Sequence, residues 1–351
     1  MKEVLASGWS AQGPRVAEFE KITAETVGTR FAIAVNSGTS ALYLSLLSLG
    51  ISKGDEVLVP DFTFPATGNV VYWCGASPIL VDISPSTYNI DLKDLKRQIT
   101  VRSRAIIPVD TFGFPCDYDE ILDIADDIPV VADAACSQGA TYKGRKVGGM
   151  ARLNCFSFHA RKLVATGEGG MILTNDPDLA EKARLLRSHG MKTDSWTRHI
   201  QSSAVSELQG PGHNLRMSDL TAAVGIAQIR KLEAQIRKRQ QLGAVYDDVI
   251  TSRLRTKVRL PLRQNDRTHT FQSYVVQLTN GRSLRDEAII RLRNMGIGAT
   301  IGTYSLSGIG QFIGQCPNGI KAFETTLALP MFHEMSEEDV HYVVASLAKI
   351  L

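Results

Sequence analysis

Short apolar runs alternate with helical patterns along the first two hundred residues of the chain. Phe31–Val35, Glu56–Val59 and Pro78–Ile83 are runs of this kind, and each precedes a segment with helical spacing of apolar residues. The same alternation continues through the runs Ala105–Val109, Pro129–Ala132, Cys155–Phe158 and Met171–Thr174. Strands and helices in this order predict an α/β fold, with a mainly parallel sheet flanked by helices on both faces.

The pattern changes after the turn-rich segment Gln209–His213. Apolar residues at helical spacing run from Asp219 to about Ile250, which predicts one long helix that bridges two parts of the molecule. Beyond it the sequence predicts a strand over Thr268–Leu278 and helices over Leu284–Met295 and Ser336–Leu351. We therefore expect a large α/β domain over residues 1–225 and a smaller α+β domain over residues 226–351.

Composition narrows the class of protein. The chain has 351 residues, of which 44% are hydrophobic and 21% charged, and no apolar stretch approaches the ~20 residues of a membrane-spanning helix. The first residues lack the apolar block of a signal peptide, and the five cysteines are widely spaced with no Cys-x-x-Cys pair. The net charge is +3 without a basic block. We expect a cytoplasmic enzyme without a structural metal, a nucleic-acid partner or a membrane partner.

Three polar groups stand where predicted strands end. They are the turn Asn36–Ser40, Asp133, and Ser157 with Lys162 a short loop further on. Ligands bind open α/β sheets outside the carboxyl ends of the strands. The sequence therefore predicts that these groups converge on one binding site.

Each group has a functional and a structural interpretation. The turn Asn36–Ser40 can cradle a phosphate with free N–H groups at a helix start, or it can be an ordinary helix N-cap. Asp133 can pair with a protonated ring nitrogen, or it can cap the next turn. Lys162, upstream of a glycine-rich turn, can form a Schiff base in partly apolar surroundings, or it can be a solvated surface lysine.

Motifs for other chemistries are incomplete. GATYKGRKV approximates a phosphate-binding P-loop, but Arg145 stands where the lysine belongs. GTSAL lacks the final glycine of a nucleophile elbow, and His333 has no second histidine at zinc-protease spacing. No Gly-x-Gly-x-x-Gly follows the first strand. These gaps disfavour nucleotide hydrolysis, serine hydrolysis, zinc proteolysis and dinucleotide binding.

Eight segments, taken in order, resemble the DegT/DnrJ/EryC1/StrS family of sugar aminotransferases, which have fold type I and use pyridoxal 5′-phosphate (PLP). The resemblance runs nearly end to end. The segments are GPRVAEFE (13–20), NSGTSAL (36–42), DEVLVPDFTFPAT (55–67), PILVDISPSTYNID (78–91), DAACSQGA (133–140), FSFHARK with TGEGG (156–170), LLRSHGM (185–191) and HNLRMSDLTAAVGIAQI (213–229).

The resemblance implies roles for residues around the cofactor ring. Lys162 matches the lysine that forms the internal aldimine and later shuttles a proton. Asp133 matches the acid that keeps the pyridine nitrogen protonated, and Phe64 matches the aromatic residue that stacks on the ring. Cys136 stands beside the ring where relatives often carry glutamine or histidine. Tyr304 is a candidate for the histidine that relatives often have in a substrate-facing segment.

The resemblance also implies a phosphate site that two chains share. Thr39 and Ser40 match the phosphate-binding turn, and Ser157 matches the hydroxyl that joins it. Asn214 matches a residue that reaches the phosphate from the neighbouring subunit, with Arg216 close by. These matches imply a homodimer with shared active sites.

The implied reaction transfers an amino group from L-glutamate, through the pyridoxamine form of the cofactor, to a nucleotide-linked keto-deoxysugar. An aminotransferase of a cyclitol or related carbocyclic ketone would keep the same lysine and stays open as an alternative. A non-catalytic PLP-binding regulatory protein is a second alternative, although it need not keep Lys162, Asp133 and Phe64 together. A sugar dehydratase of the family would carry histidine in place of Lys162.

Overall fold

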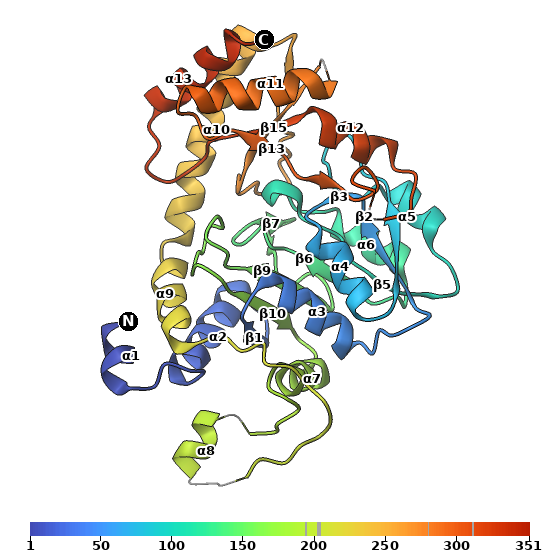
Figure 1. Ribbon diagram of the computed structural model, residues 1–351, viewed down its shortest axis with the longest axis vertical. Coiled ribbons are helices and arrows are strands. Elements are labelled where there is room, and N and C mark those ends of the chain that lie inside the picture. Colours follow the sequence, from blue (N-terminus) through green and yellow to red (C-terminus); the bar gives the residue numbers. More distant parts are fainter. Residues whose placement is uncertain (194, 202–204, 280, 311) are drawn as a thin grey trace.

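In the computed structural model, seven strands form one twisted sheet at the centre of the larger part of the molecule (Figure 1). The structure describes residues 1–193, 195–201, 205–279, 281–310 and 312–351. The strands are β1 (Phe31–Val35), β2 (Glu56–Pro60), β4 (Ser77–Val81), β5 (Ser103–Ile106), β6 (Val131–Asp133), β9 (Leu153–Ser157) and β10 (Gly170–Thr174). Their order is β4-β2-β5-β6-β9-β10-β1, with β5 and β6 joined by parallel bridges at Ile106–Val130 and Val109–Asp133.

Strand direction in this sheet confirms the predicted mainly parallel arrangement. The pairs from β4 to β9 are parallel, and β10 runs antiparallel to both β9 and β1. Since β10 alone is reversed, β1 again points the same way as β6 and β9. The carboxyl ends of β1, β6 and β9 therefore lie at one edge of the sheet.

Alternate residues of the strands face two helical layers. Ile33 and Val35 belong to an apolar cluster with α3, α4 and α7, whereas Ala32 and Ala34 belong to a cluster with α2 and α9. Further along the second face, α5 and α6 cover β2, β4 and β5. The helices are α2 (Pro14–Val27), α3 (Gly38–Ser48), α4 (Ala66–Trp73), α5 (Leu92–Gln98), α6 (Tyr118–Ala125) and α7 (Pro177–Arg187). The layers are those of the predicted α/β fold.

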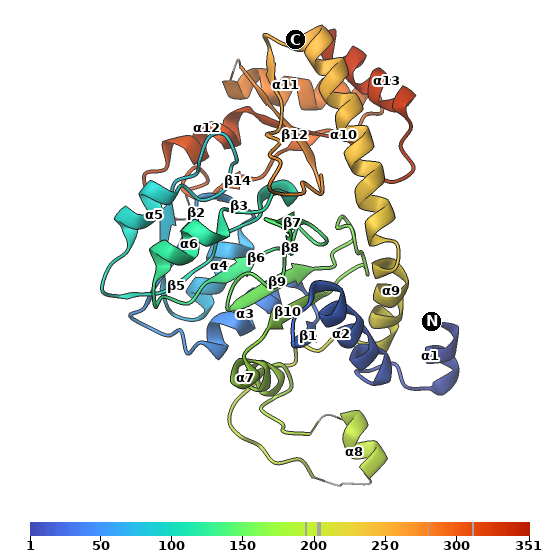
Figure 2. The ribbon, with the colours of Figure 1, turned by 180° about the vertical axis from the view of Figure 1, so that it is seen from behind.

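The predicted long helix is wrong in one respect, because the chain forms two helices there. These are α9 (Asp219–Ile229) and α10 (Leu232–Leu254), with Arg230 and Lys231 between them. Ile226, Leu232 and Ile236 pack with the large sheet, while α10 from Leu242 onward packs with the C-terminal residues. Figure 2 shows α10 rising along one side of the molecule from the large sheet to the C-terminal elements.

The C-terminal residues build a second sheet, named the C-terminal sheet below, in the order β11-β12-β15-β13. Its second strand begins later than predicted, at Tyr274 instead of Thr268. The strands are β11 (Val258–Arg259), β12 (Tyr274–Leu278), β13 (Thr300–Ile301) and β15 (Thr326–Leu329), and the helices are α11 (Gly281–Asn294), α12 (Pro317–Thr325) and α13 (Glu337–Ala348). Helices α10, α11 and α13 bury one apolar cluster against this sheet.

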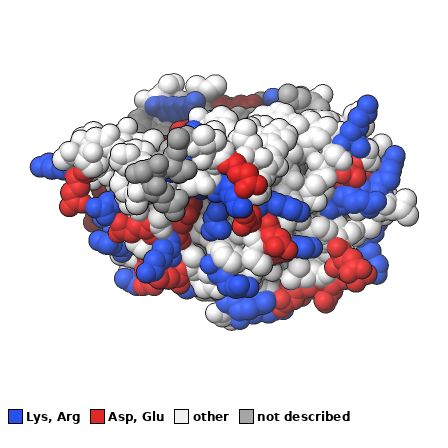
Figure 3. Space-filling view, turned by 90° about the horizontal axis from the view of Figure 1, so that it is seen from below, with Lys and Arg blue, Asp and Glu red and all other residues white. Residues whose placement is uncertain are grey.

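Short elements complete the described chain. They are α1 (Lys2–Ser7), α8 (Ser195–Gln201), the 3-10 turn η1 (Thr111–Gly113), and the two-residue strands β3 (Phe62–Thr63), β7 (Thr141–Tyr142), β8 (Arg145–Lys146) and β14 (Tyr304–Ser305). Helix α8 lies on an arm that extends away from the large sheet (Figure 1). Seen from below, Lys and Arg side chains alternate with Asp and Glu over the surface (Figure 3). Among the described residues, no helix has the length and apolar character needed to span a bilayer.

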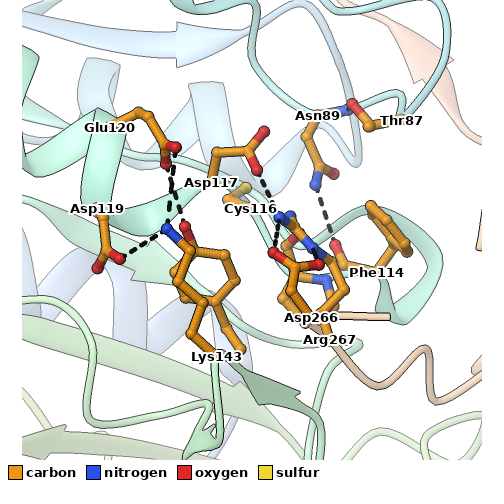
Figure 4. Close-up of polar contacts among 12 residues, drawn as sticks. Thr87, Asn89, Phe114, Cys116, Asp117, Asp119, Glu120, Lys143, Asp266 and Arg267 are labelled. Atoms are coloured by element: carbon orange, nitrogen blue, oxygen red, sulfur yellow. Dashed lines mark hydrogen bonds and ion pairs between the residues drawn. The ribbon is translucent and has the colours of Figure 1, made fainter. Parts of the chain in front are cut away.

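A buried arginine joins the C-terminal part to the large sheet. The side chain of Arg267 is 3% exposed, and its guanidinium contacts Asp117 at 2.6 Å, Asp266 at 2.8 Å and the Pro115 carbonyl at 2.9 Å (Figure 4). Its Cζ atom also lies 4.8 Å from the centre of the Tyr142 ring. A guanidinium saturated by carboxylates and a carbonyl holds its partners in fixed geometry. These contacts fix one edge of the C-terminal part relative to the large sheet.

His269, close by, makes the stability of the protein pH-dependent. Burial lowers the pKa of its imidazole to about 3, and Nδ1 accepts a hydrogen bond from the Phe271 N–H at 3.1 Å. In the unfolded chain the pKa of this imidazole is about 6.5. Between about pH 6.5 and 3 the unfolded state therefore binds a proton that the folded state does not bind. The contribution of His269 to the free energy of unfolding is therefore complete above about pH 6.5, and it falls by about 1.4 kcal/mol per pH unit as the pH drops towards 3.

The variant His269→Asn tests this effect, because its side-chain oxygen can still accept from the Phe271 N–H without titrating. Urea unfolding between pH 7 and 4 is expected to show a shallower loss of unfolding free energy in the variant than in the wild type. Equal slopes would show that His269 is not the group responsible.

Candidate active site

A cavity of about 350 Å³ opens at the carboxyl ends of β1, β6 and β9. Its floor carries all three polar groups predicted to converge there: Ser37–Thr39, Asp133, and Ser157 with Lys162. Its other wall comes from the C-terminal part, through Thr300–Tyr304 and Gln272. The volume is that of a typical small-molecule site.

Lys162 lies on a tight loop after β9. Its backbone N–H donates to the His159 carbonyl at 2.8 Å, and the Ala160 N–H donates to the Gly167 carbonyl at 2.9 Å. The side chain is half-buried, and Nζ donates to Cys136 Sγ at 3.0 Å. The lysine predicted from sequence thus faces the cavity, and it lies beside the predicted cysteine.

Asp133 ends β6 and lines the same cavity, with 7% of its surface exposed. Thr67 Oγ1 donates to Oδ2 at 2.9 Å, and the Ala135 N–H donates to Oδ1 at 3.3 Å. Burial raises the pKa of the Asp133 carboxyl, although the Thr67 hydrogen bond and the Lys162 charge act in the opposite direction. A bound cation would therefore stabilise the ionised carboxylate further.

The turn after β1 forms the start of α3. Ser37 is its N-cap, and its Oγ accepts from the Ser40 N–H at 3.0 Å. The N–H groups of Gly38 and Thr39 have no intrahelical acceptor, and both residues line the cavity. Ser40 does not line it, because its hydroxyl donates to Asn36 Oδ1 at 2.6 Å.

Two glycines permit close packing beneath this turn. A Cβ on Gly170 would lie 2.3 Å from the Ser37 carbonyl oxygen, and one on Gly38 would lie 2.7 Å from Ser157 Cβ. Ser157, buried at the end of β9, thereby lies directly against the helix start and lines the cavity. Together these residues form an anion site of the kind found at helix N-termini.

Phe64 projects over the cavity from the segment between β3 and α4. Its ring centre lies 6.3 Å from that of Tyr304, and both residues line the cavity. Phe64 is nevertheless 59% exposed. An aromatic face is therefore available on the cavity side, with Tyr304 beside it on the C-terminal side.

Asn214 stands apart from the cavity of its own chain. It is exposed and pairs with Ser188 in an isolated bridge, while Arg216 pairs with Val35 at the end of β1. Neither residue lines the cavity. Burial and the charges of Arg187 and Arg198 lower the pKa of Arg216. Of the ten residues to which the resemblance gave a role, seven line the cavity, whereas Ser40, Asn214 and Arg216 do not.

Two supporting residues were not predicted from the sequence. Thr67 binds Asp133, and Thr63 Oγ1 lies 3.0 Å from Thr67 Oγ1. Asp110 accepts hydrogen bonds from Ser137 Oγ at 2.5 Å and Tyr118 Oη at 2.9 Å, which fixes the turn that carries Cys136. Burial raises the pKa of Asp110 to about 6. Thr63 and Thr67 stand four positions apart after a predicted strand, and this spacing could have indicated the role of Thr67. Nothing in the sequence indicated the role of Asp110.

The residues present fit PLP. The free N–H groups of Gly38 and Thr39, with the Ser157 hydroxyl, suit its phosphate. Buried Asp133 suits a protonated pyridine nitrogen, and the Lys162 amine suits the aldehyde. When bound, the cofactor supplies an electron sink for the carbon next to the transferred nitrogen. The fold and the site define an enzyme of fold type I that depends on PLP.

Comparison with known proteins supports the same class of enzyme. The model of the DegT/DnrJ/EryC1/StrS aminotransferase family matches residues 1–348, and the chain belongs to this family. It is 38% identical to GDP-perosamine synthase of Caulobacter vibrioides, over 99% of this chain and 94% of that protein. It is 36% identical to the spore coat polysaccharide biosynthesis protein SpsC of Bacillus subtilis, over 99% and 92%.

A solved structure resembles the whole chain. It is the PLP form of the putative sugar aminotransferase Spr1654 of Streptococcus pneumoniae, with a TM-score of 0.91, 26% identity, and coverage of 99% of this chain and 94% of that one. The chain is therefore a PLP-dependent aminotransferase of the sugar aminotransferase family, which confirms the prediction from its motifs.

Proposed function

We propose that the protein transfers the amino group of L-glutamate to the ketone of a nucleotide-linked deoxyhexose. The observation that carries this proposal is the cavity that holds Lys162, Asp133 and the free helix start at one sheet edge. Similarity to GDP-perosamine synthase supports a nucleotide-linked sugar as acceptor. Hydroxyls of Thr300, Thr303 and Tyr304 on the opposite wall suit a polar acceptor.

The chain's own groups then have distinct tasks. Lys162 would hold the cofactor and, once its amine is free, would move a proton between the two carbons that flank the transferred nitrogen. Asp133 holds the proton on the ring nitrogen, and Thr67 fixes the orientation of that carboxylate. Phe64 would cover the ring face, and Cys136 would accept a hydrogen bond from the lysine amine when that amine is not bound to the cofactor.

We also propose that the active enzyme is a homodimer with shared sites. Phe64 lines the cavity yet is 59% exposed, and two further exposed aromatic residues, Tyr72 and Trp73, lie at the end of α4. Exposed apolar side chains near an active site are typical of a protein interface. Exposed Asn214, outside its own cavity, would then complete the phosphate site of the second copy.

Two further proposals concern organisation. We propose a large cofactor-binding domain over residues 1–225 and a small domain over 226–351, which the separate apolar cluster of the C-terminal part supports. A cytoplasmic location is proposed on the five cysteines, which are free thiols.

The experiment that tests the function is a spectral titration of the PLP-loaded protein with L-glutamate. The band of lysine-bound PLP is expected to disappear as the pyridoxamine form accumulates, with one equivalent of 2-oxoglutarate released per site. Incubation of that form with nucleotide-linked 3-keto and 4-keto sugars should then give an aminated product by mass. An unchanged spectrum at saturating glutamate would refute the proposal.

A further inference from the structure

Arg161 is a cation on the rim of the cavity without a neutralising partner. Its side chain is exposed and lines the cavity beside Lys162. Among the described residues, its guanidinium forms no ion pair and no side-chain hydrogen bond, although its backbone forms two. An unpaired guanidinium that faces a ligand cavity is suited to bind an anion with two parallel hydrogen bonds.

The backbone of Arg161 is held from both sides. Its N–H donates to His159 Nδ1 at 3.2 Å, and its carbonyl accepts from Gln272 Nε2 at 3.1 Å. Ser273 Oγ in turn donates to Gln272 Oε1 at 3.1 Å. Gln272 and Ser273 directly precede β12, so the rim joins the loop after β9 to the C-terminal sheet. This support limits the freedom that Arg161 loses when it binds a ligand.

The other charged groups on the described lining have partners. Asp133 accepts from Thr67 and Ala135, and Lys162 Nζ donates to Cys136. Glu168 Oε1 lies 3.9 Å from His159 Nε2, and the two form an ion pair when the imidazole is protonated. The positive charge of Arg161 is therefore available to a substrate.

We propose that Arg161 binds the diphosphate of the nucleotide-linked acceptor, an inference that rests on the proposed function. The α-carboxylate of an amino-acid donor is attached to the carbon that carries the amino group, so it must lie deep, beside Lys162. In a nucleotide-linked hexose the diphosphate is attached at C1, several bonds from a ketone at C3 or C4. That anion therefore lies farther towards solvent, where the exposed side chain of Arg161 stands.

Calorimetric titration of the PLP-loaded protein with GDP, UDP and dTDP tests the proposal. For the diphosphate that the wild type binds most tightly, Arg161→Gln is expected to weaken binding by about 10-fold or more, and Arg161→Lys by less. Arg237→Gln serves as the matched control, because Arg237 is an exposed residue of α10 paired with Glu233. It should bind like the wild type.

The glutamate titration separates this proposal from the proposed function. Arg161→Gln should convert with glutamate at a concentration dependence within about twofold of the wild type, since the deep part of the site is intact. Unchanged nucleoside diphosphate affinity in Arg161→Gln, or no binding of any of the three by the wild type, would overturn the role of Arg161 while leaving amino transfer from glutamate untouched. A raised glutamate requirement with unchanged diphosphate affinity would assign Arg161 to the donor instead.

Discussion

Replacing Lys162 by alanine is expected to abolish amino transfer, with a fall in rate of at least about 10³-fold. Among the described residues that line the cavity, Lys162 is the lysine, and its amine contacts Cys136. In the proposed function this amine is both the attachment point of the cofactor and a proton carrier. No neighbouring described side chain of the floor offers a second amine. Stopped-flow measurement of the glutamate half-reaction, with the PLP-loaded variant, gives the rate directly.

An experiment that mixes two inactive variants serves as the control for misfolding, and it also tests whether the active site is shared between two chains. Lys162→Ala and Asn214→Asp are each expected to be inactive alone, the second because its carboxylate would repel the phosphate. The two variants are mixed in equal amounts, unfolded and then refolded together. If Asn214 completes the partner's site, about a quarter of wild-type activity is recovered, because half of the dimers contain one chain of each variant and each such dimer has one intact site. No recovery, with both variants folded and dimeric, would contradict the shared site.

Replacing Asp133 by asparagine has the second-largest expected effect, a fall of about 10²-fold or more in the glutamate half-reaction. The carboxylate is buried and lies at the end of β6, where it can hold a proton on the ring nitrogen of the cofactor. Asparagine keeps the shape and can still accept from Thr67, but it carries no charge. Cofactor binding should persist, because the phosphate site at the start of α3 is unchanged.

Two comparisons sharpen this test. Thr67→Val should slow the same step by no more than about tenfold, because it removes one hydrogen bond and leaves the charge. A PLP analogue methylated on the ring nitrogen carries a permanent positive charge, so it should restore part of the rate to Asp133→Asn. If Asp133→Asn retained more than half of the wild-type rate with ordinary PLP, Asp133 would not be the group that keeps the ring nitrogen protonated.

The sequence predicts the large sheet well because its strands are apolar runs separated by turns. Phe31–Val35 has the bounds of β1, and the convergence of Asn36–Ser40, Asp133 and Ser157 follows from parallel strands that end at one edge. The reversal of β10 was not predictable, because an apolar run such as Met171–Thr174 has no direction. Only its bounds could be read from the residues.

Elements beyond residue 209 show where periodicity stops being informative. Helical spacing continues across Arg230 and Lys231, so the break between α9 and α10 leaves no mark in the apolar pattern. Strands of two residues such as β13 are shorter than one period of alternation. Asp110 is isolated in the sequence, and its contacts with Ser137 and Tyr118 arise only when β5 and β6 lie side by side.

Borohydride reduction of the PLP-loaded protein, followed by mass-spectrometric mapping of the modified peptide, tests directly whether Lys162 holds the cofactor. We expect the cofactor to be fixed to Lys162 in near-stoichiometric amount, and prior conversion with glutamate to prevent the labelling. Attachment to another lysine, or no attachment in protein that binds PLP, would contradict this expectation.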